Sequence, residues 1–145
     1  MPSAEHSVSI NRPVGEVFAF VADGENARRW RPGVLDVQRA SGEGLGAIYR
    51  QGVKGPGGRR IAADYEVTSL DPDARIAFRA IAGPVRPTGE YRFSSEGDAT
   101  RVSLALEATL TGWKRLLMGR AVQSTMEAEV HNLETLKSIL EDTSG

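Results

Sequence analysis

The chain contains no cysteine, and this absence removes two kinds of chemistry. Without thiols the protein forms no disulfide and has no thiolate nucleophile, so a reducing compartment is the natural expectation for it. Histidine is also scarce, with 2 residues in a chain of 145. A usual zinc site would then need several carboxylates to converge on these two side chains. We therefore expect neither a metal ion nor another cofactor.

An excess of charge of one sign and a long apolar run are missing as well. Lys and Arg total 18 against 19 Asp and Glu, so the formal net charge is -1 and no positive field favours nucleic acid. The longest purely apolar run, residues 17–22, is far shorter than the roughly 20 residues that a membrane-spanning helix needs. Residues 1–9 show no signal-peptide pattern. We expect a cytoplasmic protein with no nucleic-acid partner and no stable membrane insertion.

Residues 11–32 are the most informative stretch of the sequence. Pro13 suits a first helical turn, where its missing N–H costs nothing, and Asp23 with Gly24 ends the run. Between them, apolar residues recur at helical spacing: Val14, Val17, Phe18 and Val21. The pattern predicts a short amphipathic helix after a first strand, residues 5–10, and before a turn that carries Trp30.

The middle of the chain predicts antiparallel strands joined by turns rich in Gly, Pro and Asp. Together with residues 5–10 there are about seven of them: residues 35–39, 47–53, 61–70, 75–82, 89–96 and 99–108. The Gly97-Asp98 pair is a hairpin signal that places Phe93 opposite Val102 and Tyr91 opposite Leu104. Alternation along the strands gives one apolar face and one polar face, and it assigns Asp64 and Glu66 to the polar one.

The last predicted element is a helix over residues 113–141, with Gly119 as a bend or break near its start. Its apolar stripe consists of Val122, Met126, Val130, Leu133, Leu136 and Leu140. A sheet with one apolar face and one amphipathic helix can bury these surfaces only against each other. The sequence therefore predicts an α+β fold, with residues 1–145 forming a single domain.

The order of these elements resembles the START-like, or helix-grip, superfamily, in particular its polyketide cyclase/dehydrase and lipid-transport group. The resemblance is carried by residues 13–18, the turn 26–32 with Trp30, residues 65–68 before Asp71-Pro72, Gly97 with residues 100–102, and residues 133–137. It implies a curved antiparallel sheet of about seven strands wrapped around a long C-terminal helix, with short helices after strand one. It also implies a hydrophobic cavity between sheet and helix, although it names no ligand.

All three tyrosines of the chain fall on the predicted inner face, where a buried phenol needs a hydrogen-bond partner. A cavity that holds a polar ligand or water would supply one. The alternative is a set of core aromatics whose hydroxyls reach the rim, and we favour the cavity because a dry core would use Phe. The predicted ligand-binding residues are Tyr49, Gln51, Tyr65, Phe78, Tyr91, Phe93, Met126 and Glu129.

Glu129 is the candidate catalytic residue, because it points into the apolar stripe of the final helix. A carboxylate removed from water there either pairs with a cation or favours its protonated form, which is how a general acid or base is made. A salt-bridged Glu on a slightly rotated helix explains the pattern equally well. His6 lies on the inner face of the first strand and is interpreted as a half-buried imidazole, whereas His131 faces outward.

Two further stretches have alternative interpretations. Residues 42–47 match the pattern G-x-G-x-x-A, but a strand follows them where a dinucleotide site needs a helix. Residues 113–120 mix aromatic, apolar and basic side chains and could contact a membrane or the mouth of the cavity. We favour the simpler interpretation of residues 113–120 as the beginning of a helix that packs on the sheet.

Three functions remain open. The first is the binding of a small hydrophobic or amphipathic ligand, such as a lipid, a polyketide-like aromatic or an isoprenoid, by a monomer or homodimer. The second is a polyketide cyclase or dehydratase in which Glu129 acts as acid or base and tyrosines hold an enolate oxygen. The third is a non-catalytic interaction module whose cavity is filled by side chains.

Overall fold

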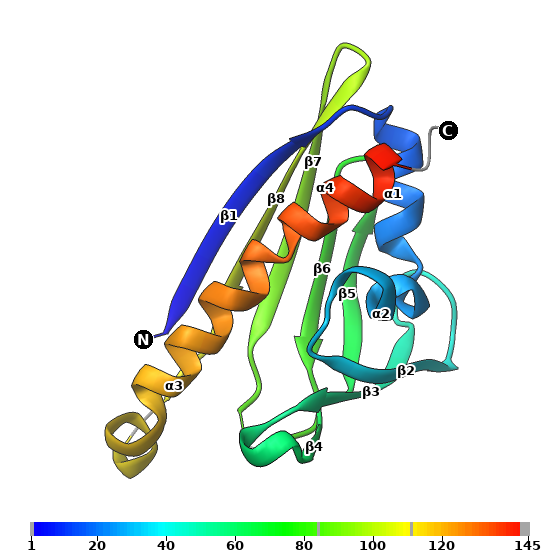
Figure 1. Cartoon of the computed structure of the whole chain (residues 1–145). Coiled ribbons are helices and arrows are strands. Elements are labelled where there is room, and N and C mark those ends of the chain that lie inside the picture. Colours follow the sequence, from blue (N-terminus) through cyan, green and yellow to red (C-terminus); the bar gives the residue numbers. More distant parts are fainter. Residues whose placement is uncertain (1, 84, 111, 143–145) are drawn as a thin grey trace.

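A curled antiparallel sheet and a long C-terminal helix form the molecule (Figure 1). The computed structural model describes residues 2–83, 85–110 and 112–142. The strands are β1 (Ser3–Ile10), β2 (Val34–Ser41), β3 (Ile48–Lys54), β4 (Arg60–Ala62), β5 (Tyr65–Asp71), β6 (Arg75–Ala80), β7 (Thr88–Glu96) and β8 (Ala99–Glu107). Seven of them lie in the order β1-β8-β7-β6-β5-β3-β2, and the short β4 pairs with β3.

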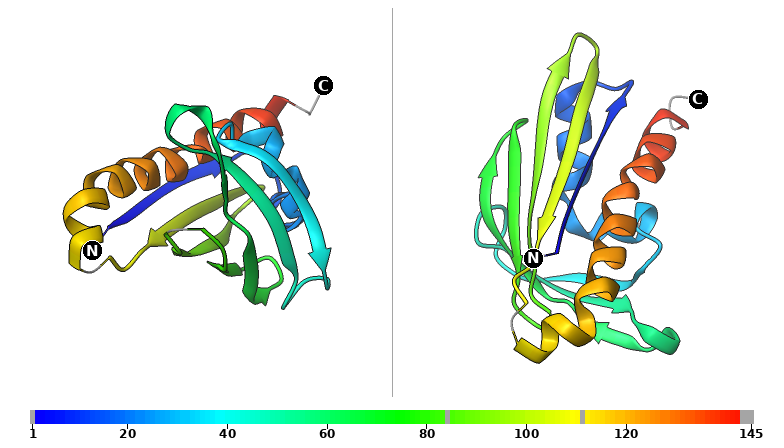
Figure 2. Two further views of the ribbon diagram at one scale, coloured as in Figure 1. Left: turned by 90° about the horizontal axis from the view of Figure 1, so that it is seen from below. Right: turned by 90° about the vertical axis from the view of Figure 1, so that its left-hand side faces the viewer.

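The helices fill the concave side and one end of this sheet. They are α1 (Val14–Ala22), the short turns η1 (Gly24–Asn26) and α2 (Ala27–Trp30), then α3 (Gly112–His131) and α4 (Leu133–Asp142), with a further short turn η2 (Pro56–Gly58) between β3 and β4. Figure 2 shows α3 and α4 lying along β1, with the remaining strands curving away beneath them. The predicted α+β helix-grip fold is confirmed. None of the helices within the described ranges is both long enough and apolar enough to cross a membrane.

The last hairpin has the register that its turn predicts. Gly97 adopts a φ of +67°, a left-handed conformation that suits glycine, and Glu96 pairs with Ala99 across the turn. Phe93 therefore lies opposite Val102, and Tyr91 lies opposite Leu104. Tyr91, Phe93, Val102 and Leu104 consequently share the face of the sheet that packs against the helix.

The first helix also agrees with its prediction. It begins at Val14 after the extended Pro13 and ends at Asp23, whose carboxylate accepts a hydrogen bond from the Glu25 N–H at 3.1 Å. Val17 and Phe18 are buried, while Val14 and Val21 pack against the same core. The Phe18 ring meets Phe93 edge to face, with 5.2 Å between the centroids, so α1 closes one end of the concave face.

The prediction of one continuous strand over residues 61–70 is wrong, because Asp64 interrupts it. The Asp64 carboxylate accepts a hydrogen bond from the Gln51 backbone N–H at 3.1 Å, taking the place of a backbone carbonyl in the ladder. The segment divides into β4 and β5, with Ala63 and Asp64 between them. Asp64 therefore shapes the pairing of β4 and β5 with β3 and is not a solvated side chain of a regular strand.

The C-terminal helix has the predicted stripe but a different break. Five residues of that stripe are buried: Met126, Val130, Leu133, Leu136 and Leu140. Helix α3 continues through Gly119, so the helix has no break at that residue, and it is interrupted at Asn132. The Asn132 N–H donates to the Glu129 carbonyl three residues earlier, at 3.1 Å. This tightened turn ends α3 because asparagine competes locally for backbone hydrogen bonds.

Polar contacts attach α3 and α4 to the edge strand β1. Gln123 accepts from the Ser3 N–H at 3.0 Å and donates to the Ser3 carbonyl at 2.6 Å. Farther along, Lys137 donates to the Ser9 carbonyl at 2.6 Å. These contacts satisfy backbone groups at the edge of the sheet and fix how the helix lies along it.

The first turns of α3 extend past the strand that the helix follows. Helices of 20 and 10 residues joined by Asn132 span roughly 46 Å at the helical rise. The 8 residues of β1 span about 27 Å. Trp113, Leu116 and Leu117 are accordingly 65%, 87% and 75% exposed. The favoured interpretation of residues 113–120, a helix start packed on the sheet, is therefore wrong.

Candidate functional site

A connected row of aromatic rings covers the concave face of the sheet. Tyr49 stacks on Tyr65 with 5.0 Å between centroids, and Tyr65 meets Phe78 edge to face at 5.7 Å. The row continues from Phe78 to Tyr91 at 5.8 Å and from Tyr91 to Phe93 at 6.4 Å. Because β3, β5, β6 and β7 each contribute, the row crosses the sheet beneath the C-terminal helix.

Arg31 enters this aromatic surface from the turn that follows α2. Trp30 is 3% exposed and anchors that turn, with its ring edge to face against Tyr91 at 6.2 Å. Pro32 disfavours a helical conformation for the residue before it. Arg31 is accordingly extended, with φ -116° and ψ 93°, and its side chain is only 15% exposed. The local sequence therefore places a guanidinium in the interior.

The guanidinium of Arg31 forms the centre of a polar cluster. Its Nη1 donates to the Gln51 side-chain oxygen at 3.2 Å, and its Nη2 forms an ion pair with Glu129. The other Glu129 oxygen accepts from the Asn132 side chain at 2.8 Å. Gln51 in turn donates to the Ala63 carbonyl at 3.2 Å. The cluster thus links β3, the α2 turn and the interruption between α3 and α4.

One nitrogen atom of the guanidinium has no partner in the cluster. The Nε of Arg31 is buried and has no hydrogen-bond partner among the described residues. A buried donor without a partner costs free energy, so such a group is available to an incoming acceptor. This nitrogen is the feature of the cluster that points most directly to a ligand.

Burial changes the acid–base behaviour of the groups around Arg31. Desolvation raises the pKa of Tyr91 to about 12, although the Arg31 charge opposes the shift. Desolvation also raises the pKa of Tyr65 above its ordinary range, again against Arg31. For Arg31, burial works to lower the pKa, but the Glu129 charge and hydrogen bond outweigh it and hold the pKa above its usual value. The interior therefore holds neutral phenols beside a permanent cation.

The raised pKa of Tyr91 predicts a loss of stability in alkali. An unfolded tyrosine ionises near pH 10, whereas folded Tyr91 keeps its proton to about pH 12. Its contribution is fully present below pH 10 and disappears as the pH rises to 12, with a total on the order of 2 kcal/mol. Urea unfolding at several alkaline pH values should show a shallower decline for Tyr91→Phe than for the wild type. Equal slopes for the two proteins would contradict the assignment.

The predicted ligand-binding residues lie on the surfaces that face each other across the interior. Five of the eight are buried: Tyr49, Gln51, Tyr91, Phe93 and Met126. Tyr65 and Phe78 are partly buried within the aromatic row, and the Glu129 side chain is 24% exposed. Gln51 and Glu129 meet at Arg31. Ligand contact by these residues stays a prediction.

Arg31 and Asn132 were not among the predicted site residues. Arginine is normally exposed, so its position in the sequence gave no reason to expect it inside. The available signal was its place between an anchoring Trp30 and Pro32, which fixes the direction of the turn. Asn132 had a signal of its own, an Asn within an otherwise helical pattern.

The two histidines come together at the far edge of the sheet. The His6 Nε2 lies 2.7 Å from a Glu134 oxygen, and the His6 and His131 rings are 4.3 Å apart. His6 is on the inner side of β1, and His131 is exposed, as predicted. Within the described part of the chain, no three His, Cys, Asp or Glu side chains are placed to hold a metal ion.

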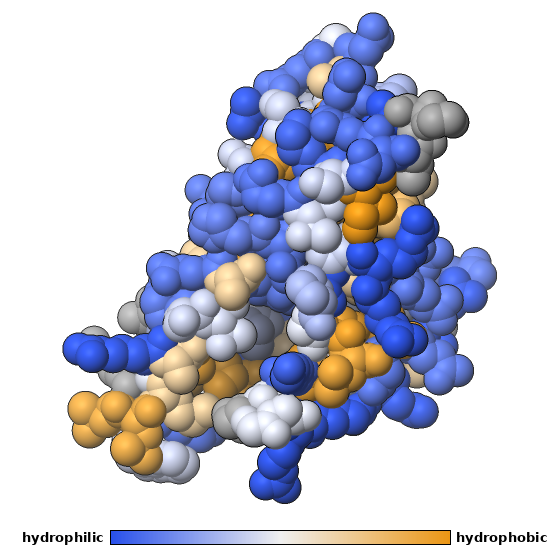
Figure 3. Space-filling view, in the orientation of Figure 1, coloured by the Kyte–Doolittle hydropathy of each residue, from blue (hydrophilic) through white to orange (hydrophobic). Residues whose placement is uncertain are grey.

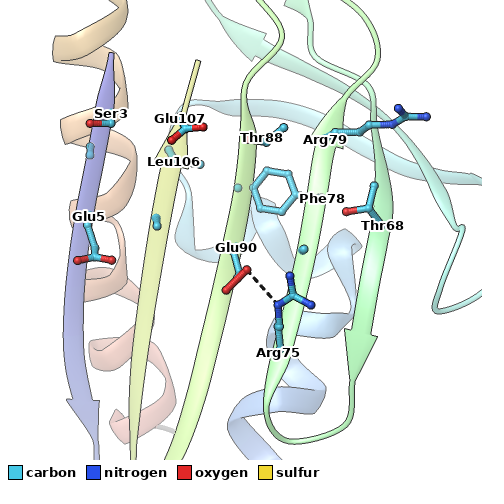
Figure 4. A pocket seen from close by; sticks show the side chains of 14 residues that line it. Ser3, Glu5, Thr68, Arg75, Phe78, Arg79, Thr88, Glu90, Leu106 and Glu107 are labelled. Carbon is cyan, nitrogen blue, oxygen red and sulfur yellow. Dashed lines mark ion pairs between the residues drawn. The ribbon is translucent and has the colours of Figure 1, made fainter. Parts of the chain in front are cut away.

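The molecule also has a hollow of about 710 Å³ on the opposite, outer face of the sheet (Figure 4). Arg75 of β6 and Glu90 of β7 point toward each other there, with 3.0 Å between Nε and the carboxylate. Charges of both signs line it, including Glu5, Arg79 and Glu107. Phe78 is the one predicted ligand-binding residue in its lining, so this hollow is not the cavity that the sequence predicts.

Chemically, the interior combines a large apolar surface with one fixed cation. A guanidinium binds carboxylate, phosphate or enolate oxygens through a planar set of donors. Phenol hydroxyls beside it can donate to the same kind of oxygen, and a carboxylate can accept or deliver a proton. The arrangement therefore suits an apolar molecule that carries an oxygen-rich polar group.

Comparison with known proteins supports the fold. The structure of a protein from Thermus thermophilus matches with 24% sequence identity and a TM-score of 0.84, covering 99% of this chain and 100% of that one. An aromatase/cyclase from Streptomyces matches with 23% identity and a TM-score of 0.72, covering 97% and 92%. A START superfamily protein from Mycobacterium smegmatis matches with 17% identity and a TM-score of 0.72, covering 97% and 95%.

Comparison with curated proteins finds no match. The family model described as polyketide cyclase/dehydrase and lipid transport, however, matches residues 1–136, which include all eight strands and most of the C-terminal helix. The chain therefore belongs to the polyketide cyclase/dehydrase and lipid transport family.

Proposed function

We propose that the protein binds a small, largely apolar molecule between the concave face of the sheet and the C-terminal helix, with Arg31 holding its polar group. The observation that carries this proposal is the buried Nε of Arg31, which has no partner among the described residues although Nη1 and Nη2 each donate to a neighbouring side chain. The aromatic row supplies the apolar surface. The ligand class is a carboxylate, enolate or other oxygen-rich amphipathic compound, such as a fatty acid or a polyketide-like aromatic.

Anilinonaphthalene sulfonate is a suitable probe, because it is aromatic, anionic and fluorescent only away from water. We expect saturable binding to the wild type and about tenfold weaker binding to Arg31→Met, which loses a charge-assisted hydrogen bond. Glu129→Gln should bind the probe more tightly, because it removes the anion that competes for Arg31. Fluorescence titration measures all three, and near-ultraviolet circular dichroism verifies that each variant is folded.

Arg60→Met is the matched control, because Arg60 forms an ion pair with Asp36 that is about half exposed. It should leave the affinity for the probe unchanged. Nile red, a neutral apolar probe, should bind wild type and Arg31→Met equally. If neither probe binds the folded wild type, an interior filled by side chains is the better account, and the chain is an interaction module.

A cyclase or dehydratase is the second candidate, and one observation favours it. Glu129 lies next to a cation, and two neutral phenols, Tyr65 and Tyr91, lie close enough to Arg31 to interact with it electrostatically. Such groups stabilise an enolate oxygen while a carboxylate moves protons. With a poly-β-ketone substrate, turnover that survives unchanged in Glu129→Gln would remove Glu129 from this mechanism.

A further inference from the structure

The first two turns of α3 carry an apolar patch that nothing in the described fold covers. Trp113, Leu116 and Leu117 are each at least 65% exposed. Their spacing, together with Arg120, is i, i+3, i+4 and i+7, which places all four on one face of the helix. Figure 3 shows hydrophobic residues gathered at the end of the molecule where Figure 1 places the start of α3. Helices normally bury an apolar face of this kind, whereas α3 leaves it exposed to solvent.

The helix segment that carries this apolar patch has charged residues of one sign. The sequence from Gly112 to Met126 contains three basic residues and no acidic one. Beside this segment, Lys114 lines a hollow together with exposed Arg86 and with Glu107 at the end of β8. The whole chain is by contrast close to neutral, with a formal net charge of -1. The excess of positive charge is therefore local to this end.

We propose that this end of the molecule docks on an anionic membrane surface. Trp113, Leu116 and Leu117 enter the interfacial layer of the lipid, and the surrounding Lys and Arg side chains face the headgroups. Tryptophan favours the boundary between headgroups and acyl chains, and basic residues beside an apolar helix face are typical of helices that lie in this layer. The contact is peripheral, in keeping with the helices in the described part of the chain, each of which is too short or too polar to span a bilayer.

A second copy of the chain fits this patch less well. Two like patches would bring the same positive charges together, which weakens association. A stable interface also uses roughly 20 residues on each side, many more than the patch offers. An anionic surface, in contrast, attracts the charges and accepts the apolar side chains together.

A second hollow lies beside the patch. It measures about 540 Å³ and is lined by Arg86, Thr109 and Lys114, among others. Docking would bring this hollow, whose lining is mostly polar, to the lipid headgroups. The docking itself does not depend on the proposed ligand site, because it is carried by α3 alone and is tested with empty vesicles.

Sedimentation with lipid vesicles tests the proposal. We expect the wild type to bind vesicles of phosphatidylcholine with phosphatidylglycerol, to bind pure phosphatidylcholine weakly, and to dissociate in high salt. The triple variant Trp113→Ser, Leu116→Ser, Leu117→Ser should partition at least about tenfold less. Because each basic residue contributes about fivefold, Lys114→Glu with Arg120→Glu should also reduce partitioning by more than about tenfold.

Matched controls separate the patch from general effects. Leu45→Ser removes a side chain that is 65% exposed on another loop, and Arg50→Glu reverses an exposed charge on β3. Both should bind anionic vesicles as the wild type does, and thermal melting of all variants should be unchanged because none of the altered side chains is buried. On binding, the fluorescence of Trp113 should shift to shorter wavelength, while buried Trp30 stays constant.

Three results would overturn the proposal. The first is a wild type that binds neither kind of vesicle. The second is a triple variant that binds anionic vesicles as well as the wild type does. The third is a wild type that binds no vesicles but forms a dimer in light scattering, together with a triple variant that is monomeric. The patch would then be an interface between copies of the chain.

Discussion

Trp30→Ala is expected to lower the free energy of unfolding by about 4 kcal/mol, whereas Trp113→Ala should change it by less than about 0.5 kcal/mol. The chain has two tryptophans, and they differ in burial: Trp30 is 3% exposed and Trp113 is 65% exposed. Removing the buried indole leaves a cavity beside Tyr91 and deletes an edge-to-face contact. Removing the exposed one leaves no cavity. Comparing the two substitutions therefore isolates the effect of burial on stability, because both remove the same type of side chain.

Urea unfolding followed by far-ultraviolet circular dichroism measures both variants. Since typical domains are stable by roughly 5–15 kcal/mol, Trp30→Ala should retain about 1–11 kcal/mol. Trp30→Phe keeps an aromatic ring in the site and should lower the free energy of unfolding by less than half as much. It therefore serves as a control that remains folded. Equal losses for Trp30→Ala and Trp113→Ala would contradict the placement of Trp30 in the core.

Local patterns in the sequence predicted most of the sheet and helix cores correctly. Alternation along a strand and spacing along a helix depend on backbone geometry alone, so they remain valid whatever packs against them. The Gly97-Asp98 turn fixed the register of Tyr91 and Phe93 because a two-residue hairpin leaves little freedom. The stripe from Met126 to Leu140 was buried for the same kind of reason.

The errors arose where distant segments compete for the same groups. Asp64 was assigned to a regular strand, but its carboxylate accepts the Gln51 N–H and interrupts the pairing. A bend or break was expected at Gly119, but the helix is interrupted at Asn132, whose side chain donates to Glu129. The start of α3 was expected to pack on the sheet, but Trp113, Leu116 and Leu117 are exposed because the helix is longer than β1.

In the candidate site too, local patterns predicted the positions of side chains but not their partners from distant parts of the sequence. Tyr49, Tyr65 and Tyr91 were placed on the inner face by alternation, and Glu129 was singled out by its helix position. The partner of Glu129 could not be deduced, because Arg31 lies 98 residues away. A buried arginine is rare enough that composition argues against it. Its location follows only from the turn that Trp30 anchors.

Arg31→Met is expected to lower the free energy of unfolding by about 2 kcal/mol. The substitution leaves the Glu129 carboxylate, 24% exposed, and the buried Gln51 side chain without their cationic partner. Removal of one member of a fully buried pair costs about 3–5 kcal/mol, and the residual exposure of Arg31 and Glu129 reduces that figure. Arg60→Met, at the half-exposed pair with Asp36, should cost much less and is the matched control.

The double variant Arg31→Met, Glu129→Gln decides what this pair contributes. If the main penalty of Arg31→Met is an unpaired carboxylate, neutralising Glu129 should recover about 1 kcal/mol or more, which a double-mutant cycle from urea unfolding measures. Additive losses would show instead that Arg31 stabilises the fold through its contacts with Gln51 and the aromatic row. Strong coupling together with tighter binding of the anionic probe by Glu129→Gln would establish that Glu129 and the ligand compete for one guanidinium. Arg31 would then be the residue through which stability and ligand binding depend on each other.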